Sequence, residues 1–177
     1  MAAARDLVAR GGAAELSMGD VAVGAGVSKA LVHYHYRDKD SLLRALVLDT
    51  GNAIATRARA ALTKPAGGHA LDEYWSAVET ELRTGDLRVL ISLAEYDSEA
   101  VRSAARQVAA DRRDLTAQQL TSVLNQLGLT MPVPVALLAD TVLAFLDGLA
   151  IAVALDADRD PRPAFDVFWL SLLTLAE

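Results

Sequence analysis

A short run of side chains near residue 30 has the types and spacing needed to contact a nucleic acid. Lys29 carries a permanent positive charge, and His33 and Tyr34 follow it about one helical turn later. Ammonium, imidazole and phenol groups donate hydrogen bonds to phosphates and to base edges. Ala30 and Leu31 add methyl groups that could meet thymine methyls. Packing in a core would explain Leu31 equally well.

The residues before this run have the pattern of a helix-turn-helix unit. Ala22 is small, where a second helix would cross closely, and Gly26 falls at the turn, where a positive φ costs glycine little. Ser28 would cap the second helix and leave its first backbone amides free for a phosphate. The side chains expected to pack the two helices together are Val21, Val27 and Val32. Such a unit presents its second helix to the major groove.

Other kinds of site find little support in the sequence. The chain has no cysteine, no nucleophile-elbow serine motif and no Walker loop. His33 and His35 would point about 200° apart on a helix, so they cannot chelate one metal ion together. Gly24 and Gly26 lack the third glycine of a dinucleotide loop. We therefore expect no catalytic residue, no metal site and no cofactor, and not an enzyme.

Charge divides the chain of 177 residues into two parts. Residues 1–47 hold six basic and five acidic side chains, whereas the remainder holds eleven basic and eighteen acidic ones, within a net charge of −6. A protein this acidic does not bind nucleic acids indiscriminately, because that mode depends on neutralising phosphates. The N-terminal residues have no apolar signal core, and the lack of cysteine fits a reducing compartment. We expect a cytoplasmic protein.

Helical periodicity runs through the chain and predicts an all-α fold of about nine helices. Stop and start signals indicate a break at residues 64–68, which contain one proline and two glycines. The helices are expected near residues 2–10, 17–25, from 28, 38–62, 71–82, 86–96, 98–127, 133–155 and after 163.

The segment 133–155 is apolar on nearly every side and long enough to cross a membrane. Asp140 and Asp147 lie inside it, so we reject a membrane span. Protein must then cover most of its surface. It is either a central core helix or, with the last helix, a subunit interface. The residues expected at that interface are Leu149, Val153, Phe165, Phe168, Trp169 and Leu172.

The second part of the chain also holds large aromatic side chains that could line a pocket for a small apolar or amphipathic ligand. Ordinary core packing would explain each of them singly. The candidate ligand-binding residues are Tyr74, Trp75, Tyr96 and Phe145.

The run from Gly26 to Leu43, GVSKALVHYHYRDKDSLL, resembles the DNA-binding domain of the tetracycline-repressor (TetR) family of bacterial transcription regulators. The resemblance implies a helix-turn-helix domain at 1–47 and an effector-binding and dimerisation domain at 48–177. It implies that His35 and Lys39 contact DNA and that Tyr36 is a core aromatic. The family often places Thr or Arg where this chain has Met18 and Gly19, so phosphate contacts there would come from Ser17 or from backbone amides.

Together these features predict a ligand-responsive repressor that binds a near-palindromic double-stranded operator as a homodimer. Its effector would be a small molecule. The alternative is a helical protein–protein adaptor with a degenerate DNA-binding unit.

Overall fold

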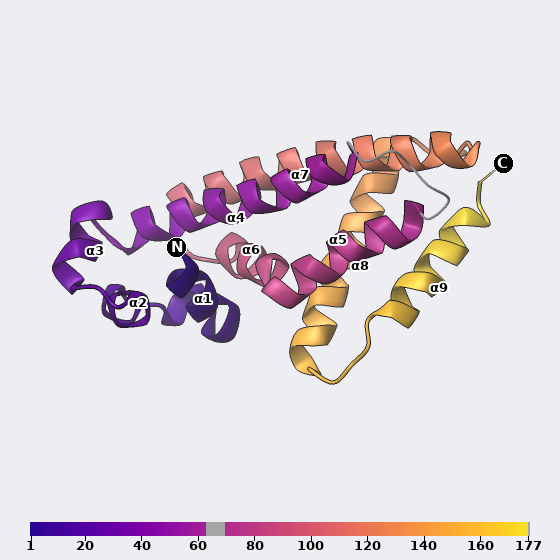
Figure 1. Ribbon diagram of the computed structural model, residues 1–177. Coiled ribbons are helices and arrows are strands. Elements are labelled where there is room, and N and C mark those ends of the chain that lie inside the picture. The colour runs from indigo at the N-terminus through magenta and orange to yellow at the C-terminus, as the bar shows by residue number, and fades with distance from the viewer. Residues whose placement is uncertain (63–69, 177) are drawn as a thin grey trace. The chain divides into compact units, whose positions relative to one another are not determined.

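The computed structural model describes residues 1–62 and 70–176, and the regular structure of these residues is entirely helical (Figure 1). The predicted all-α fold is confirmed, although the break expected at residues 64–68 lies outside the described residues. The helices are α1 (Ala2–Glu15), α2 (Met18–Ala25), α3 (Lys29–His35), α4 (Lys39–Leu62), α5 (Ala70–Thr84), α6 (Asp86–Ala94), α7 (Glu99–Leu127), α8 (Val135–Leu155) and α9 (Arg162–Leu173).

Helix α1 extends beyond its expected end near residue 10, and it is broken at Gly12. Gly12 has a φ of 82°, outside the helical region, and one further turn continues to Glu15. The break takes the amide of Ala13 out of the helical ladder. That amide donates instead to the Ser92 hydroxyl of α6, at 2.8 Å. A glycine is needed at residue 12 because other residues rarely adopt a positive φ.

Asp38 stands at the start of α4, as the sequence predicts. Its carboxylate accepts the backbone N–H of Ser41 at 2.8 Å, and the Ser41 hydroxyl donates back to the Asp38 carbonyl at 2.8 Å. The backbone hydrogen bond from Ser41 is the main cause that lowers the pKa of Asp38. The charged carboxylate therefore fixes the corner where α3 turns into α4.

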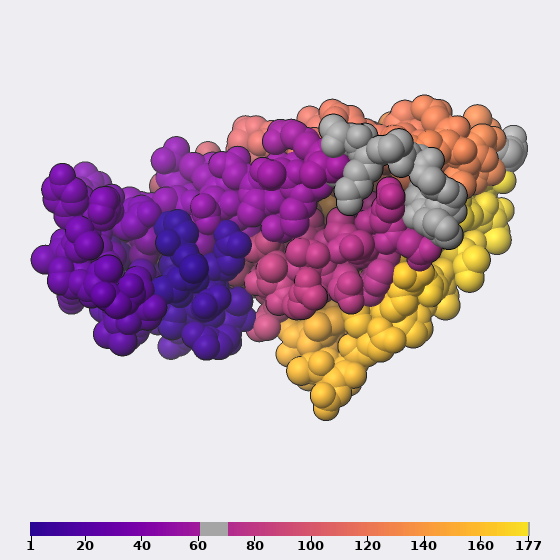
Figure 2. Space-filling view, in the orientation of Figure 1, coloured from indigo at the N-terminus to yellow at the C-terminus, as the bar shows by residue number. Residues whose placement is uncertain are grey.

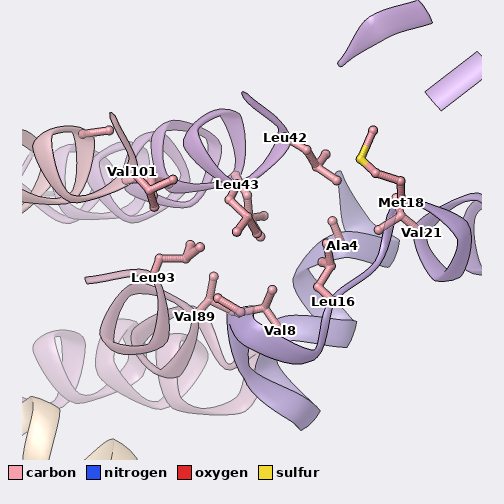
Figure 3. Packing of buried hydrophobic residues seen from close by; sticks show 14 of the residues in the cluster. Ala4, Val8, Leu16, Met18, Val21, Leu42, Leu43, Val89, Leu93 and Val101 are labelled. Atoms are coloured by element: carbon pink, nitrogen blue, oxygen red, sulfur yellow. The ribbon is translucent and has the colours of Figure 1, made fainter. Parts of the chain in front are cut away.

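The chain packs as two units, and two segments distant in sequence form the first of them. Residues 1–54 and 85–110 make this first unit, so α6 and the first part of α7 belong with the N-terminal helices. Figure 3 shows its core, in which side chains of α1, α2, α4, α6 and α7 meet. Leu43, Val89, Leu93 and Val101 are fully buried there.

Within this unit α4 passes very close to α7. A Cβ built on Gly51 would lie 2.7 Å from both γ-carbons of Val108. No side chain fits at that distance, so glycine is required for the approach of the two helices.

The second unit comprises residues 55–84 and 111–177, and aromatic rings hold much of its described part together. Phe165 of α9 lies against Trp75 of α5, with ring centroids 4.9 Å apart, and Tyr74 meets Trp169 edge-on at 5.6 Å. Consecutive arginines tie α7 to α8. Nη1 of Arg112 lies 2.8 Å from the carboxylate of Asp147. Arg113 pairs with Asp140, and its Nη2 lies 2.9 Å from Oδ2 of that carboxylate.

Helix α8 is long and apolar enough to cross a membrane by length and composition alone. A single helix of this kind is a weak indication, because the core helix of a globular protein passes the same test. Both of its aspartates form ion pairs with α7. Its deeply buried residues, including Leu138, Val142 and Leu146, face the protein.

Candidate nucleic-acid interface

The candidate interface begins with the cap of α2. The Ser17 hydroxyl accepts the backbone N–H of Asp20 at 3.1 Å and donates to the Asp20 carboxylate at 2.6 Å. Ser17 is therefore the N-cap of α2. The serine hydroxyl is thus engaged both as an acceptor and as a donor.

The turn between α2 and α3 adopts the backbone that the glycine predicts. Gly26 has φ 65° and ψ 31°, in the left-handed region. Its N–H donates to Val23 O at 3.1 Å, and the next N–H, of Val27, donates to Ala22 O at 3.0 Å. This pattern ends α2 within one residue and fixes the direction in which α3 leaves.

Helix α3 is capped as predicted, because the Ser28 hydroxyl accepts the backbone N–H of Leu31 at 3.1 Å. Among the residues of α3 only Val32 is buried, and Tyr34 keeps 83% of its surface exposed. Figure 2 shows this helix uncovered on the visible face. The helix contains no acidic residue. Its exposed side chains are Lys29, Ala30, Leu31, His33, Tyr34 and His35.

The packing beneath α3 follows the sequence with one partial exception. Val21, Ala22 and Val32 are buried as expected, whereas Val27 is still 39% exposed. Tyr36 packs against the core, and its hydroxyl donates to the Met1 sulfur at 3.1 Å. The helix-turn-helix therefore has a continuous apolar support on its inner side.

Lys39, which we expect to contact a phosphate, also has a partner within the protein. Its Nζ donates to the Ala14 carbonyl at 2.7 Å and lies 5.2 Å from the centre of the Tyr96 ring. The Tyr96 hydroxyl in turn donates to Asp40 at 3.3 Å. Burial, followed by the negative charge of Asp40, raises the pKa of Tyr96. Tyr96 thus lies in the first unit, apart from the other ligand candidates.

One charged cluster of the first unit was not found by sequence reasoning. Arg5 of α1 pairs with Asp49 of α4 at 2.8 Å and with Asp86 of α6 at 3.0 Å. The Asp86 side chain has no exposed surface. The available signal was a lone carboxylate opening a short apolar helix. Arg5 therefore connects the N-terminal helix to two helices that lie far along the chain.

The remaining ligand candidates lie in the second unit and belong to one network of ring contacts. Tyr74 and Trp75 both contact Phe165. Phe145 stacks on Phe168 with ring centroids 4.1 Å apart, and Phe168 in turn meets Trp169 edge-on at 5.9 Å. A separate open groove of about 430 Å³ runs between α4 and α5. None of the candidate aromatics lines that groove; its walls include Arg57, Ala60, Asp72, Ser76 and Thr80.

The residues expected at a subunit interface differ in exposure. Val153 and Phe168 are half-buried. The other four already pack inside the second unit of a single chain: Leu149, Phe165, Trp169 and Leu172. Substituting these four would test folding before it tested association.

A capped three-helix module whose third helix is uncovered, basic and bears two histidines defines a DNA-binding protein of the helix-turn-helix class. Residues 1–46 match the family model for bacterial regulatory proteins of the tetR family. Residues 1–46 therefore form a DNA-binding domain of the tetR family, and the chain is a DNA-binding regulator.

Solved structures share this fold over almost the whole chain. A transcriptional regulator from Pseudomonas aeruginosa is 25% identical, with a TM-score of 0.69 over 93% of this chain and 82% of that chain. A TetR-family regulator from Rhodococcus sp. is 23% identical, with a TM-score of 0.74 over 98% and 95%. The regulator FadR from Bacillus subtilis, solved with stearoyl-CoA, is 16% identical, with a TM-score of 0.69 over 93% and 91%. No curated protein sequence matches the chain significantly.

Proposed function

We propose that this regulator is a cytoplasmic repressor that binds its operator as a homodimer and leaves it when a small molecule binds. The uncovered helix α3, with Lys29 and two histidines and no acidic residue, is the observation that carries DNA binding. Residues 1–47 would form the DNA-binding domain. Residues 48–177 would bind the effector and the second subunit.

Each exposed residue of the module is assigned a contact by its chemistry. Lys29 would read a base or phosphate, and Ala30 and Leu31 would meet apolar edges. His33, Tyr34 and His35 would donate to phosphates, together with the first amides of α3 behind Ser28 and those of α2 behind Ser17. Lys39 would contact a phosphate with the donors that Ala14 leaves free.

An exposed stripe of apolar and small residues supports the dimer. Along α8 it recurs at intervals of three and four residues, so its members lie on one face. These residues are Leu137, Thr141, Ala144, Gly148, Ile151 and Leu155. On α9, Val167 and Leu170 are about two-thirds exposed. Two such helices from each subunit would form a four-helix interface about a two-fold axis.

The operator would have the same two-fold symmetry as the dimer. Two copies of α3 related by a two-fold axis need half-sites about one helical turn apart, or a multiple of it, roughly 34–36 Å for each turn. The operator should therefore be near-palindromic.

Release would depend on the connection between α5 and α6. Helix α5 bears Tyr74 and Trp75 in its first half, and Gly85 alone separates the end of α5 from α6. Helix α6 holds α1 through Arg5 and Ser92, so movement of α6 would displace the DNA-binding helices. An effector must favour the non-binding state by about 1–3 kcal/mol for a typical coupling. The operator would then weaken effector binding by the same factor.

A mobility-shift experiment with the DNA upstream of the protein's own gene tests this proposal. We expect a shifted complex that competes with its own sequence and not with scrambled DNA. Loss of the shift on adding a candidate effector would support regulated release. Full-length, dimeric protein that binds no specific DNA would instead favour the adaptor. An effector that binds equally well with and without operator would leave the larger domain as a dimerisation scaffold.

A further inference from the structure

A groove of about 300 Å³ opens inside the DNA-binding module, on the inner side of α3 that bears Val32. Its floor includes three buried side chains from α1, α2 and α4, namely Ala4, Val21 and Leu42. Figure 3 shows these three close together at one end of the core of the first unit. All the described residues that line the groove belong to residues 1–47, so it is not part of the proposed effector domain.

Apolar side chains at the mouth of the groove are only partly covered. Val27 and Leu31 both line it, yet they remain 39% and 43% exposed. A bound apolar molecule would remove this surface from water, which favours binding. An apolar cavity of roughly 150 Å³ binds benzene, so a groove of this size has room for about two fused rings.

His35 supplies the groove with a polar group that a ligand can use. Its exposed ring contacts those of Tyr34 and Tyr36, with centroids 5.3 and 6.4 Å away, and these neighbours favour an aromatic ligand. The Tyr36 hydroxyl is already engaged by the Met1 sulfur. No aspartate, glutamate, lysine or arginine occurs among the described lining residues, so a charged ligand would lose its hydration without gaining an ionic partner.

We propose that this groove is a second small-molecule site, and that it takes an uncharged aromatic compound of one or two rings with a single hydroxyl that hydrogen-bonds to His35. Lining residues from α1, α2, α3 and α4 would surround the rings. The site goes beyond the proposed function, which places the effector in residues 48–177.

The position of His35 connects this site to the operator, and this step rests on the proposed function, in which His35 donates to a phosphate. A neutral imidazole has one nitrogen that accepts and one that donates. A ligand hydroxyl that donates to the groove-side nitrogen leaves the proton on the other nitrogen, where a phosphate can accept it. Ligand and operator would therefore strengthen each other's binding, by about fivefold at the low end of typical couplings.

Three probes with one ring system test the class of ligand. Naphthalene has no polar group, 2-naphthol has a hydroxyl and 2-naphthoate has a negative charge. Calorimetric titration of the full-length protein without DNA should give 2-naphthol about fivefold higher affinity than naphthalene, as expected for one hydrogen bond of ordinary strength. 2-Naphthoate should bind no better than naphthalene.

Two matched substitutions on α2 locate the bound probe. Ala25 lines the groove at the end of α2, so Ala25→Phe would place a ring in it and should weaken 2-naphthol binding at least tenfold. Val23→Phe adds a ring to the same helix at a position that is 83% exposed and is not among the described lining residues, and it should leave the affinity unchanged. Thermal unfolding of both variants checks that they fold.

His35→Phe keeps a flat ring at the groove and removes its hydrogen-bonding nitrogens. It should lower the ratio of 2-naphthol to naphthalene affinity about threefold to fivefold. The chain has three histidines, so labelled imidazoles give three sets of signals, and this variant assigns those of His35. 2-Naphthol should shift the His35 signals. In mobility-shift titrations it should tighten operator binding about fivefold in the wild type and not in His35→Phe.

Several results would overturn the site. They are 2-naphthol binding that is unchanged in Ala25→Phe, tighter binding of 2-naphthoate, imidazole shifts confined to the other histidines, or no binding of 2-naphthol at its solubility limit. Operator affinity that is unchanged or weakened by bound 2-naphthol would overturn the coupling. Wild-type protein that binds 2-naphthol in the groove but binds no specific DNA would refute the proposed regulator and leave the site standing.

Discussion

In the DNA-binding module, some residues are exposed to the proposed operator and others stabilise the fold. Lys29 is exposed at the start of α3, whereas Lys39 is half-buried and donates to the Ala14 carbonyl. Two lysines ten residues apart therefore have different surroundings, and this difference makes their substitutions distinguishable.

Lys29→Ala should lower operator affinity by about 1–3 kcal/mol if Lys29 contacts a base, and should relax the preference at one base position. Lys39→Ala should weaken binding to all sequences alike, reduce the salt slope by about one and lower thermal stability, because its bond to α1 is lost. Operator titrations at several salt concentrations measure both effects. A changed sequence preference in Lys39→Ala would contradict this division of roles.

Arg5 places its guanidinium against the buried carboxylate of Asp86. Arg5→Met should destabilise the fold by about 3 kcal/mol, because it removes a cation from a fully buried carboxylate. Urea denaturation of the variant gives this value. Asp49→Asn is the matched control, since Asp49 is 43% exposed and its loss should cost less than about 1 kcal/mol. Equal effects of the two variants would show that Asp86 does not rely on Arg5.

At the scale of elements, the approach of α4 to α7 depends on one glycine. Gly51→Ala should cost about 1–3 kcal/mol, because the added methyl would overlap Val108 and push the helices apart. Gly11→Ala is the matched control in α1, where the new Cβ would stand 3.6 Å from its neighbour, and it should be neutral or stabilising. Thermal unfolding compares the two variants.

A second set of variants tests the cause assigned to that loss. Val108→Ala removes both of the methyl groups that the new Cβ would meet. The double variant Gly51→Ala/Val108→Ala should therefore be less destabilised than the sum of the two single variants. Additive losses would mean that the cost of Gly51→Ala arises elsewhere.

At the scale of the whole molecule, the uncovered faces of α8 and α9 predict association. Leu170→Glu should convert the dimer into a monomer with little loss of fold stability, because Leu170 is 65% exposed in the single chain. Light scattering at micromolar concentration and thermal unfolding measure the two properties. Leu127→Glu, on the exposed end of α7, is the control and should leave the dimer intact. A wild-type monomer under these conditions would refute the proposed interface.

Much of the secondary structure and most of the local geometry of the module could be predicted from the sequence. Ser17, Gly26, Ser28 and Asp38 have the roles in the structure that their types predict. Caps and turns depend on residues a few positions apart, so their physics is contained in a short window. On α3 the helical period places His33 and Tyr34 one turn after Lys29, whereas it leaves Leu31 open between contact and core.

Only the tertiary structure decided which distant segments meet. Residues 85–110 pack with the N-terminal helices, Arg5 reaches Asp86, and Tyr96 contacts Asp40 rather than the other candidate aromatics. It also buried Trp169 and Leu149 within the chain and left Leu170 and Ile151 outside. Periodicity identifies the apolar face of each helix but not the helix that covers it. That choice depends on packing between residues far apart in sequence, and a nearly all-apolar helix such as α8 carries no local signal to make it.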